Sequence, residues 1–375
     1  MRIVGFGTYD REKHPRVGIL LDGLSQLGEE VTELNAPLGF STAERVAMLE
    51  RPWLSYRLVL RLLRRWSALI IKRTTTLPAA PDVVLVGYLG HFDVILARLL
   101  FPRTVIALDL LIFAGDTASD RGVHKGAKLT LLNALDHLAI GFASMVIVDS
   151  EEHVRLLPTS SRHKAVIAPV GSPDEWFAEP SEIEASKLKV LFFGMFTPLQ
   201  GAPVIGEAIA MLPPNSGIEV TMIGSGQDLA ETRRRSGDSQ LVTWRDWVEP
   251  DQLRRLSRDH HVCLGIFADT PKALRVTPNK VFQGAAAGCA ILTSDTAAQR
   301  RSLGDAALFV PVADPAALAE ALRSLAANPG EVLRLRQSAQ QKAEADFRPR
   351  IVAQPLYADL RARKKPAPGR NRKRD

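Results

Sequence analysis

The sequence has very little cysteine and no long uncharged apolar run, and each absence argues against a class of protein. Only Cys263 and Cys289 occur in 375 residues, outside any C-x-x-C pair or Cys/His cluster, which argues against a disulfide framework and a structural zinc site. No stretch of about 18 or more apolar residues is free of charged side chains, so we expect no membrane-spanning helix. The first residues lack the apolar core and the cleavage site of a signal peptide, so we expect a cytoplasmic protein.

Short apolar runs alternate with helical patterns along most of the chain. A strand over residues 2–7, a helix over 17–28 and a strand over 30–35 open the sequence, and four more strand-like runs follow. After a polar segment that contains prolines, the same alternation starts again with five further strand-like runs. Strands that are apolar on both faces are typical of doubly wound parallel sheets. We therefore predict an α/β protein with two Rossmann-like domains, over residues 1–183 and 184–347.

The excess of positive charge lies at the carboxyl end. The net charge is +7, but residues 361–375 hold eight basic residues and one acid, which leaves 40 residues of each sign in the rest of the chain. The folded body is therefore neutral, and nucleic acid is not an expected partner. A helix over residues 348–363 is expected to pack back on the first domain, and residues 364–375 are expected to be disordered.

Two glycine turns follow predicted strands in the second half. Gly194–Gly201 forms a strand–loop–helix turn, and Gly224–Gly226 lies at the end of the next strand. Neither turn matches the G-x-G-x-x-G of dinucleotide binding or the G-x-x-x-x-G-K-[ST] phosphate loop, which weighs against a nicotinamide enzyme and a nucleoside triphosphatase. Taken alone, each turn is more often a structural feature of the fold than a binding site.

The most informative stretch is an unusual helix start. The helix is expected to begin at Thr277 or Pro278 and to carry Lys280 in its first turn, where a cation opposes the helix dipole. This conflict is explained if Lys280 and the free amides hold an anion together, with Arg275 just upstream as a second cation. The alternative is a pair of solvated surface charges.

Taken in order, the two turns, the loop Trp244–Val248 and the helix start Pro278–Lys280 resemble the donor-binding domain of family 4 glycosyltransferases of the GT-B fold. The resemblance covers about residues 188–347 and implies two Rossmann-like domains that face a cleft, with a nucleotide-sugar donor. It places the donor diphosphate on Gly194, Thr197, Gln200, Arg275, Asn279 and Lys280. It places the nucleoside on Gly224, Gly226, Trp247 and Gln283.

The sequence departs from the family pattern at its pair of acids. The two glutamates of the family's E-x7-E pair fall on Arg275 and Gln283, and the first phosphate loop lacks its usual Arg and Lys. We interpret this as positive charge moved from that loop to Arg275 and Lys280. The first half resembles the acceptor domain of the same family less closely. That resemblance implies acceptor-side residues Gly7, His14 and Arg16 and catalytic residues His91 and Asp109.

The reaction implied by the resemblance is a retaining sugar transfer. The enzyme is expected to move a sugar from a UDP- or GDP-sugar to a glycan or lipid-linked acceptor. No D-x-D motif occurs in the sequence, so we expect no metal, and the nucleotide-sugar is a co-substrate and not a cofactor. Two alternatives stay open: a sugar-nucleotide epimerase on the same scaffold, and a catalytically inactive GT-B subunit that binds a partner.

One further segment concerns location. Residues 51–73 hold seven cations and no acid, with Trp53 and Trp66 among leucines. A basic amphipathic helix with tryptophan is typical of segments that lie on anionic lipid. This predicts peripheral contact with the inner face of the plasma membrane and favours a lipid-linked acceptor. The alternative is a core helix with a solvated basic face.

Overall fold

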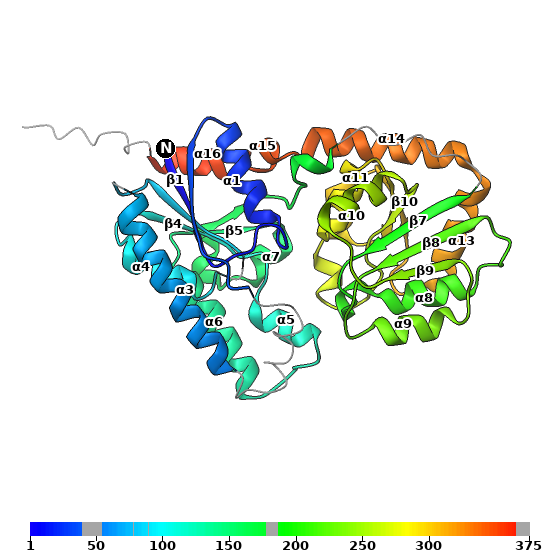
Figure 1. The fold of residues 1–375 in the computed structure, drawn as a ribbon, viewed down its shortest axis with the longest axis horizontal. Coiled ribbons are helices and arrows are strands. Elements are labelled where there is room, and N and C mark those ends of the chain that lie inside the picture. Colours follow the sequence, from blue (N-terminus) through cyan, green and yellow to red (C-terminus); the bar gives the residue numbers. More distant parts are fainter. Residues whose placement is uncertain (40–54, 78, 89, 178–186, 365–375) are drawn as a thin grey trace, which may run out of the picture.

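The computed structural model describes residues 1–39, 55–77, 79–88, 90–177 and 187–364, which form two α/β domains (Figure 1). The elements of the first domain are β1 (Arg2–Gly7), α1 (Arg16–Gln26), β2 (Glu30–Asn35), α3 (Ser55–Thr76), β3 (Val83–Val86), α4 (Asp93–Leu100), β4 (Val105–Asp109), α5 (Ala114–Asp120), α6 (Ala127–Phe142), β5 (Met145–Val148), α7 (Glu151–Leu156), η2 (Thr159–Lys164), β6 (Ala165–Ile167) and η3 (Asp174–Trp176).

The first domain contains a six-stranded parallel sheet in the order β2-β1-β3-β4-β5-β6. Alternate residues of each strand enter two different cores. In β3, Val84 and Val86 pack in the core that includes α4 and α6, whereas Val83 and Leu85 pack in the core that includes α1. All four side chains are buried, which is why the strand reads as a continuous apolar run.

The second domain repeats this architecture. Its elements are β7 (Leu188–Phe193), η4 (Pro198–Gln200), α8 (Ala202–Ala210), β8 (Ile218–Ile223), α9 (Leu229–Ser236), β9 (Val242–Arg245), α10 (Pro250–Arg258), β10 (Val262–Leu264), η5 (Ala273–Arg275), α11 (Asn279–Ala286), β11 (Ala290–Ser294), α12 (Ala297–Leu303), β12 (Ala307–Val310), α13 (Pro315–Ala327) and α14 (Pro329–Asp346). The sheet order is β12-β11-β10-β7-β8-β9, again parallel. The predicted pair of doubly wound parallel sheets is confirmed.

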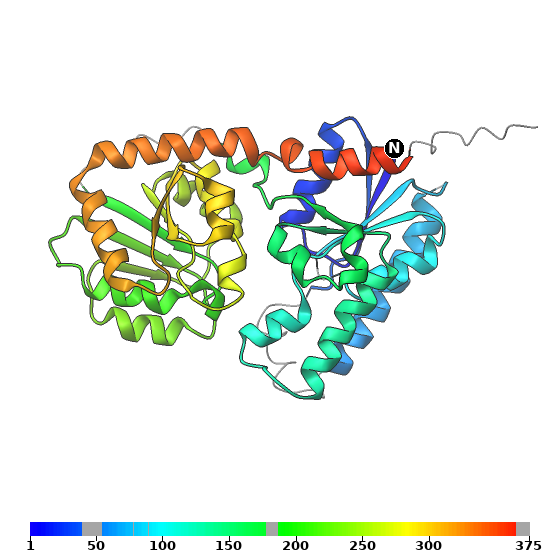
Figure 2. The ribbon, with the colours of Figure 1, turned by 180° about the vertical axis from the view of Figure 1, so that it is seen from behind.

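The C-terminal helices return to the first domain. Figure 2 shows α14, α15 (Pro349–Val352) and α16 (Gln354–Lys364) running from the second domain across to the first. There α15 packs on α1, where Gly23 has no Cβ to overlap the backbone of Pro349, and α16 contacts β6. The helix predicted over 348–363 is thus two helices. Of the predicted tail, residues 365–375 lie outside the described residues.

Both sheets turn the carboxyl ends of strands toward the boundary between the domains. Glu152, just after β5, forms an ion pair with Arg301 of the second domain, and Asp116 of α5 forms one with Arg275, which follows β10. Ligands of parallel sheets bind at these strand ends. Within the described residues, no helix is long and apolar enough to cross a bilayer.

Candidate functional site

The two predicted glycine turns form one surface. Strands β7 and β8 are neighbours, so their ends lie side by side, and the Gly194 amide donates to the carbonyl of Ile223 at 3.0 Å. Gly224 has φ +132°, and a Cβ at this position would overlap the carbonyl oxygen of Gly194. Gly226, with φ +151°, lies as closely against the backbone of Phe196. Glycine is required at both positions, because an L side chain would push the turns apart.

Lys280 lies beneath this surface. Its Nζ is 3.5 Å from the centroid of the Phe192 ring and 3.4 Å from the point where a Cβ of Gly194 would stand. The residue is 4% exposed, and among the described residues its Nζ has no hydrogen-bond partner. Burial lowers the pKa of this amine to about 7. An unpaired ammonium buried under an exposed glycine turn is costly to the fold, and an anion bound at the turn would relieve that cost.

The start of α11 adds backbone donors next to Lys280. Pro278 occupies the N-cap position, no side chain caps the helix, and no acid lies in its first turn. The half-buried Asn279 opens the helix, and Gln283 lies one turn further on. A helix N-terminus together with a buried, unpartnered cation is suited to bind a phosphate group.

The remaining predicted donor residues lie around the same strand ends. Thr197 and Gln200 are half-buried in the loop after β7, and Gln200 has a buried Oε1 without a hydrogen-bond partner. Trp247 follows β9 and is 68% exposed, so its ring is available for stacking. The nearby Trp244 is instead half-buried and is covered by the guanidinium of Arg233, 5.1 Å from its ring centroid.

Arg275 differs from Lys280 because it already has a partner. Its guanidinium forms an ion pair with Asp116 of α5, across the domain boundary, while its buried Nε has no hydrogen bond within the part of the chain that the structure describes. The structure therefore brings Gly194, Gly224 and Lys280 together and leaves Arg275 at the edge that faces the first domain. The sequence indicates that Asp116 lies near the strand ends, but it does not show the pairing with Arg275, from which 159 residues separate it.

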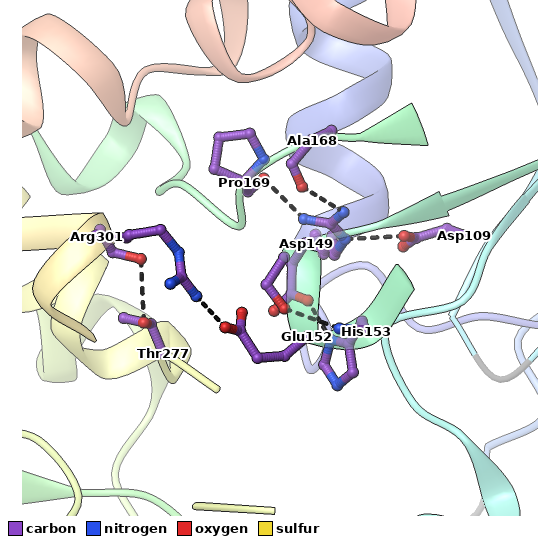
Figure 3. A network of polar contacts seen from close by, with 11 residues as sticks. Asp109, Asp149, Glu152, His153, Ala168, Pro169, Thr277 and Arg301 are labelled. Carbon is purple, nitrogen blue, oxygen red and sulfur yellow. Dashed lines mark hydrogen bonds and ion pairs between the residues drawn. The ribbon is translucent and has the colours of Figure 1, made fainter. Parts of the chain in front are cut away.

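Arg16 and Asp109, two residues predicted to face the acceptor or to be catalytic, form a buried ion pair (Figure 3). Arg16 donates from Nε to Asp109 at 2.8 Å and from its two terminal nitrogens to the carbonyl oxygens of Pro169 and Ala168, also at 2.8 Å. Both side chains are 2% exposed or less. The pair ties the end of β4 to the chain that leaves β6, and the catalytic role of Asp109 stays a prediction.

His91 is also buried. Its Nε2 lies 2.8 Å from a carboxylate oxygen of Asp136, which accepts hydrogen bonds from the amides of Ala114 and Gly115 at the start of α5. These contacts with Asp136 hold the start of α5 in place. A substrate could contact Nε2 of His91 only if the contact between His91 and Asp136 broke. The catalytic role of His91 therefore also stays a prediction.

The other acceptor-side residues lie at the end of β1 and in the loop after it. Gly7 has φ +146°, and a Cβ there would stand 2.9 Å from a carboxylate oxygen of Asp93. His14 stacks on Tyr88 with ring centroids 3.7 Å apart. His14 is half-buried and more accessible than Arg16 beside it. The assignment of Gly7 and His14 to the acceptor side stays a prediction.

Comparisons with known proteins bear on the fold and on the family of part of the chain. Residues 207–358 match the sequence-family model described as glycosyl transferase-like, and no curated protein matches the chain. Sucrose-phosphate synthase from Thermosynechococcus elongatus is similar in structure over 96% of this chain and 99% of its own, at 16% identity and a TM-score of 0.71. Anabaena HepE in complex with UDP is similar over 96% and 99%, at 12% identity and a TM-score of 0.65.

A glycosyltransferase from Rickettsia africae is a third similar structure, with 11% identity, 96% of this chain and 98% of the other covered, and a TM-score of 0.59. At such identities the likeness concerns the fold, and that fold is GT-B. The GT-B fold and the family match over residues 207–358 together indicate an enzyme of the transferase class with a glycosyltransferase-like region.

Proposed function

We propose that this protein is a retaining, metal-independent glycosyltransferase of family 4 that transfers a sugar from a UDP- or GDP-sugar to a glycan or lipid-linked acceptor. The observation that carries the proposal is the buried, unpartnered ammonium of Lys280 beneath the Gly194 turn. Anabaena HepE, which has a similar fold, was obtained in complex with UDP and with UDP-glucose. The retaining course follows from the family resemblance.

The chemical task of the site is to stabilise a leaving diphosphate. As the bond between sugar and phosphate breaks, negative charge develops on the diphosphate oxygens, and preorganised donors lower the barrier. Lys280, the amides at the start of α11 and the Gly194 turn supply these donors. Gly224, Gly226, Trp247 and Gln283 are assigned to the nucleoside.

No cofactor is part of the proposal, because the nucleotide-sugar is itself a substrate. The absence of a D-x-D motif from the sequence and the cationic helix start support diphosphate binding without a metal. In this mechanism Lys280 and the helix amides take the place of a bridging cation.

A panel of nucleotide sugars tests the function. We expect at least one UDP- or GDP-sugar to stabilise the protein against thermal unfolding, by about 2.7 kcal/mol at 100 times its dissociation constant, and to do so equally in EDTA. Product analysis then separates the alternatives, since transfer supports the proposal, an epimerised nucleotide supports an epimerase, and no turnover supports an inactive subunit. Stabilisation that needs added magnesium or manganese would contradict metal independence.

The acceptor is proposed to be lipid-linked because α3 exposes an apolar stripe. The large apolar side chains on its outer face are 42–62% exposed: Tyr56, Val59, Leu60, Leu63, Ile70 and Ile71. Leu62 and Leu69 point the other way into the domain, and α3 contains several cations but no acid. Such a face fits an anionic bilayer. It supports the proposal that the protein is cytoplasmic and binds peripherally to the inner face of the plasma membrane.

Trp66 does not contribute to the stripe as predicted. Trp66 is half-buried and donates its indole N–H to Asp93 at 2.8 Å, so it belongs to the domain interior. Trp53 lies outside the described residues. Membrane contact is therefore assigned to the apolar stripe and its flanking cations, and not to Trp66.

Liposome sedimentation tests the stripe. The double variant Leu60→Glu/Leu63→Glu is expected to bind vesicles of anionic phospholipid about tenfold more weakly than the wild type, because it places charge where the acyl chains would contact the helix. Leu333→Glu, on an equally exposed leucine of α14, is the matched control and should bind as the wild type does. Equal sedimentation with neutral and anionic vesicles, or with neither, would contradict membrane docking.

A further inference from the structure

Asp93, at the start of α4, accepts hydrogen bonds from two separate parts of the first domain. Its Oδ2 accepts the backbone amide of Thr8 at 2.7 Å and the hydroxyl of the same residue at 2.8 Å. Its Oδ1 accepts the indole N–H of Trp66, in α3, at 2.8 Å. The carboxylate is buried, with 3% exposure of the residue. One buried group therefore joins α3 to the segment between β1 and α1, residues 8–15, which we call the β1 loop.

This link depends on all of its members. A carboxylate accepts hydrogen bonds without donating any, and its two oxygens have enough lone pairs for these three donors. Burial raises the pKa of Asp93, and the hydrogen bonds from Trp66 and Thr8 oppose that rise. Because a buried carboxylate is costly when its donors are lost, a shift of Trp66 changes how firmly Asp93 holds Thr8.

A second, weaker route runs from the same helix to the same loop. Lys72 donates from Nζ to the carbonyl oxygen of Asn35 at 2.7 Å, and Asn35 donates from Nδ2 to the carbonyl oxygen of Tyr9 at 3.1 Å. Lys72 is exposed, so water competes for its hydrogen bond, whereas the bonds of Asp93 are shielded from water. We therefore expect the route through Asp93 to carry most of the coupling.

Helix α3 has little apolar surface buried against the domain. Among its described side chains Leu62 and Leu69 are buried, whereas the apolar stripe on the outer face is 42–62% exposed. A helix with few buried side chains shifts at a low cost in free energy, so a bilayer bound to the stripe would restrain it. Whatever restrains α3 also restrains Trp66, and with it the bond to Asp93.

We propose that Asp93 is a positioning residue that transmits membrane docking of α3 to the β1 loop, so that an anionic lipid surface orders this loop. The inference rests on the membrane contact of α3 proposed above. The β1 loop contains His14 and leads into Arg16, two residues assigned to the acceptor side. The surface that presents a lipid-linked acceptor thus also orders the segment that would meet it.

Hydrogen–deuterium exchange of the whole protein tests this coupling without a donor or an acceptor. The amide of Thr8 is the direct probe, because its own hydrogen bond is with Asp93. Vesicles of phosphatidylglycerol and phosphatidylcholine in equal parts are expected to slow exchange of this amide about threefold in the wild type. Vesicles of phosphatidylcholine alone should leave it unchanged.

Trp66→Phe removes the indole donor and keeps an aromatic ring in place. Trp66 lies outside the stripe, so this variant should sediment with anionic vesicles as the wild type does, while exchange at Thr8 no longer responds to them. Ser67→Ala is the matched control on the neighbouring residue, whose hydroxyl donates to the carbonyl oxygen of Leu63 within α3 at 3.0 Å. It should respond to vesicles like the wild type.

Asp93→Asn tests the carboxylate itself. The amide retains one acceptor and brings an NH₂ group toward Thr8 or Trp66, so exchange at Thr8 should be fast with and without vesicles. Melting temperatures identify a variant that does not fold. If Asp93→Asn is such a variant, Trp66→Phe, which loses a single N–H, decides the test.

A wild type that binds anionic vesicles without a change in exchange at Thr8 would overturn the inference. Equal slowing in Trp66→Phe would overturn it as well, because the bilayer would then shield the loop directly. A wild type that sediments with neither kind of vesicle would overturn membrane docking, and the inference with it. These outcomes are distinguishable, since sedimentation measures docking separately from exchange at Thr8.

Discussion

Replacing Lys280 with methionine is expected to weaken nucleotide diphosphate binding about 10- to 100-fold and to raise the melting temperature. A charge-assisted hydrogen bond contributes about 1.5–3 kcal/mol, which sets the scale of the loss. Methionine fills the same space without a buried donor that lacks a hydrogen bond, and leaving such a donor unsatisfied costs about 1–3 kcal/mol or more. At about 2–4 °C per kcal/mol, the gain is several degrees. Calorimetric titration and differential scanning calorimetry measure the two effects.

The control is Lys187→Met, which changes a lysine of the same domain that is about half exposed and paired with Glu219. It should alter neither nucleotide affinity nor melting temperature appreciably, because surface pairs contribute little. Unchanged affinity in the Lys280 variant would place the diphosphate elsewhere. A lowered melting temperature would mean that the ammonium has a stabilising partner in the folded protein.

The pH dependence of nucleotide affinity tests the predicted role of Lys280 in a second, independent way. Because the pKa of Lys280 is lowered to about 7, the free protein loses the binding cation as pH rises through that value. Nucleotide affinity should fall by up to tenfold per pH unit above 7 in the wild type and show no such fall in Lys280→Met. The neighbouring thiol of Cys263 does not interfere, since burial raises its pKa to about 12.

Stability and nucleotide binding respond to rising pH in opposite directions. Between pH 7 and the ordinary lysine value, the unfolded chain binds the proton that folded Lys280 has lost, so the free energy of unfolding rises with pH in this window. Below pH 7 both states carry the charge, and its burial destabilises the fold in full. Added nucleotide should remove this slope, because it keeps Lys280 protonated in the folded state.

Features carried by local pattern were predictable from the sequence. Apolar runs identified both parallel sheets, and the cation that opposes the dipole of α11 singled out Lys280 as a candidate to bind an anion, which stays a prediction. The required glycines at 224 and 226 were recognisable as a turn, although the contact of Gly224 with Gly194 depends on the pairing of β7 with β8. In each case the signal lies within a few neighbouring residues of the chain.

Features that depend on distant partners were not predictable. His91 and Asp109 follow strands, as catalytic residues of parallel sheets do, but their environment comes from Asp136 and Arg16, which are 45 and 93 residues away. No local pattern shows that these groups are buried. Asp116 differs from these two residues, because its partner Arg275 lies in the other domain and the pair forms only where the two domains meet. Spacing along one chain does not determine which polar residues at a strand end remain accessible.

The second large effect is expected from Arg16, which we predict to maintain the fold of the first domain. Arg16→Met leaves the carboxylate of Asp109 buried without its cation and leaves the carbonyl oxygens of Ala168 and Pro169 without donors. Breaking a buried ion pair costs about 3–5 kcal/mol, so the melting temperature should fall by about 10 °C. Arg11→Met, at a half-buried arginine paired with Asp22 and Glu33, should cost less than Arg16→Met, by about 1 kcal/mol per partly exposed pair at most.

Removing the second partner separates a structural Asp109 from a catalytic one. In Arg16→Met/Asp109→Leu no unpaired charge remains, so stability should recover most of the loss, and nucleotide binding to the second domain should equal that of the wild type. Asp109→Asn can still accept the hydrogen bond from Arg16 but loses the charge, so it should be less stable and yet transfer sugar at a normal rate per folded molecule. If Asp109→Asn instead keeps its stability and loses transfer, the carboxylate acts on the substrate, and the buried pair must open during the reaction.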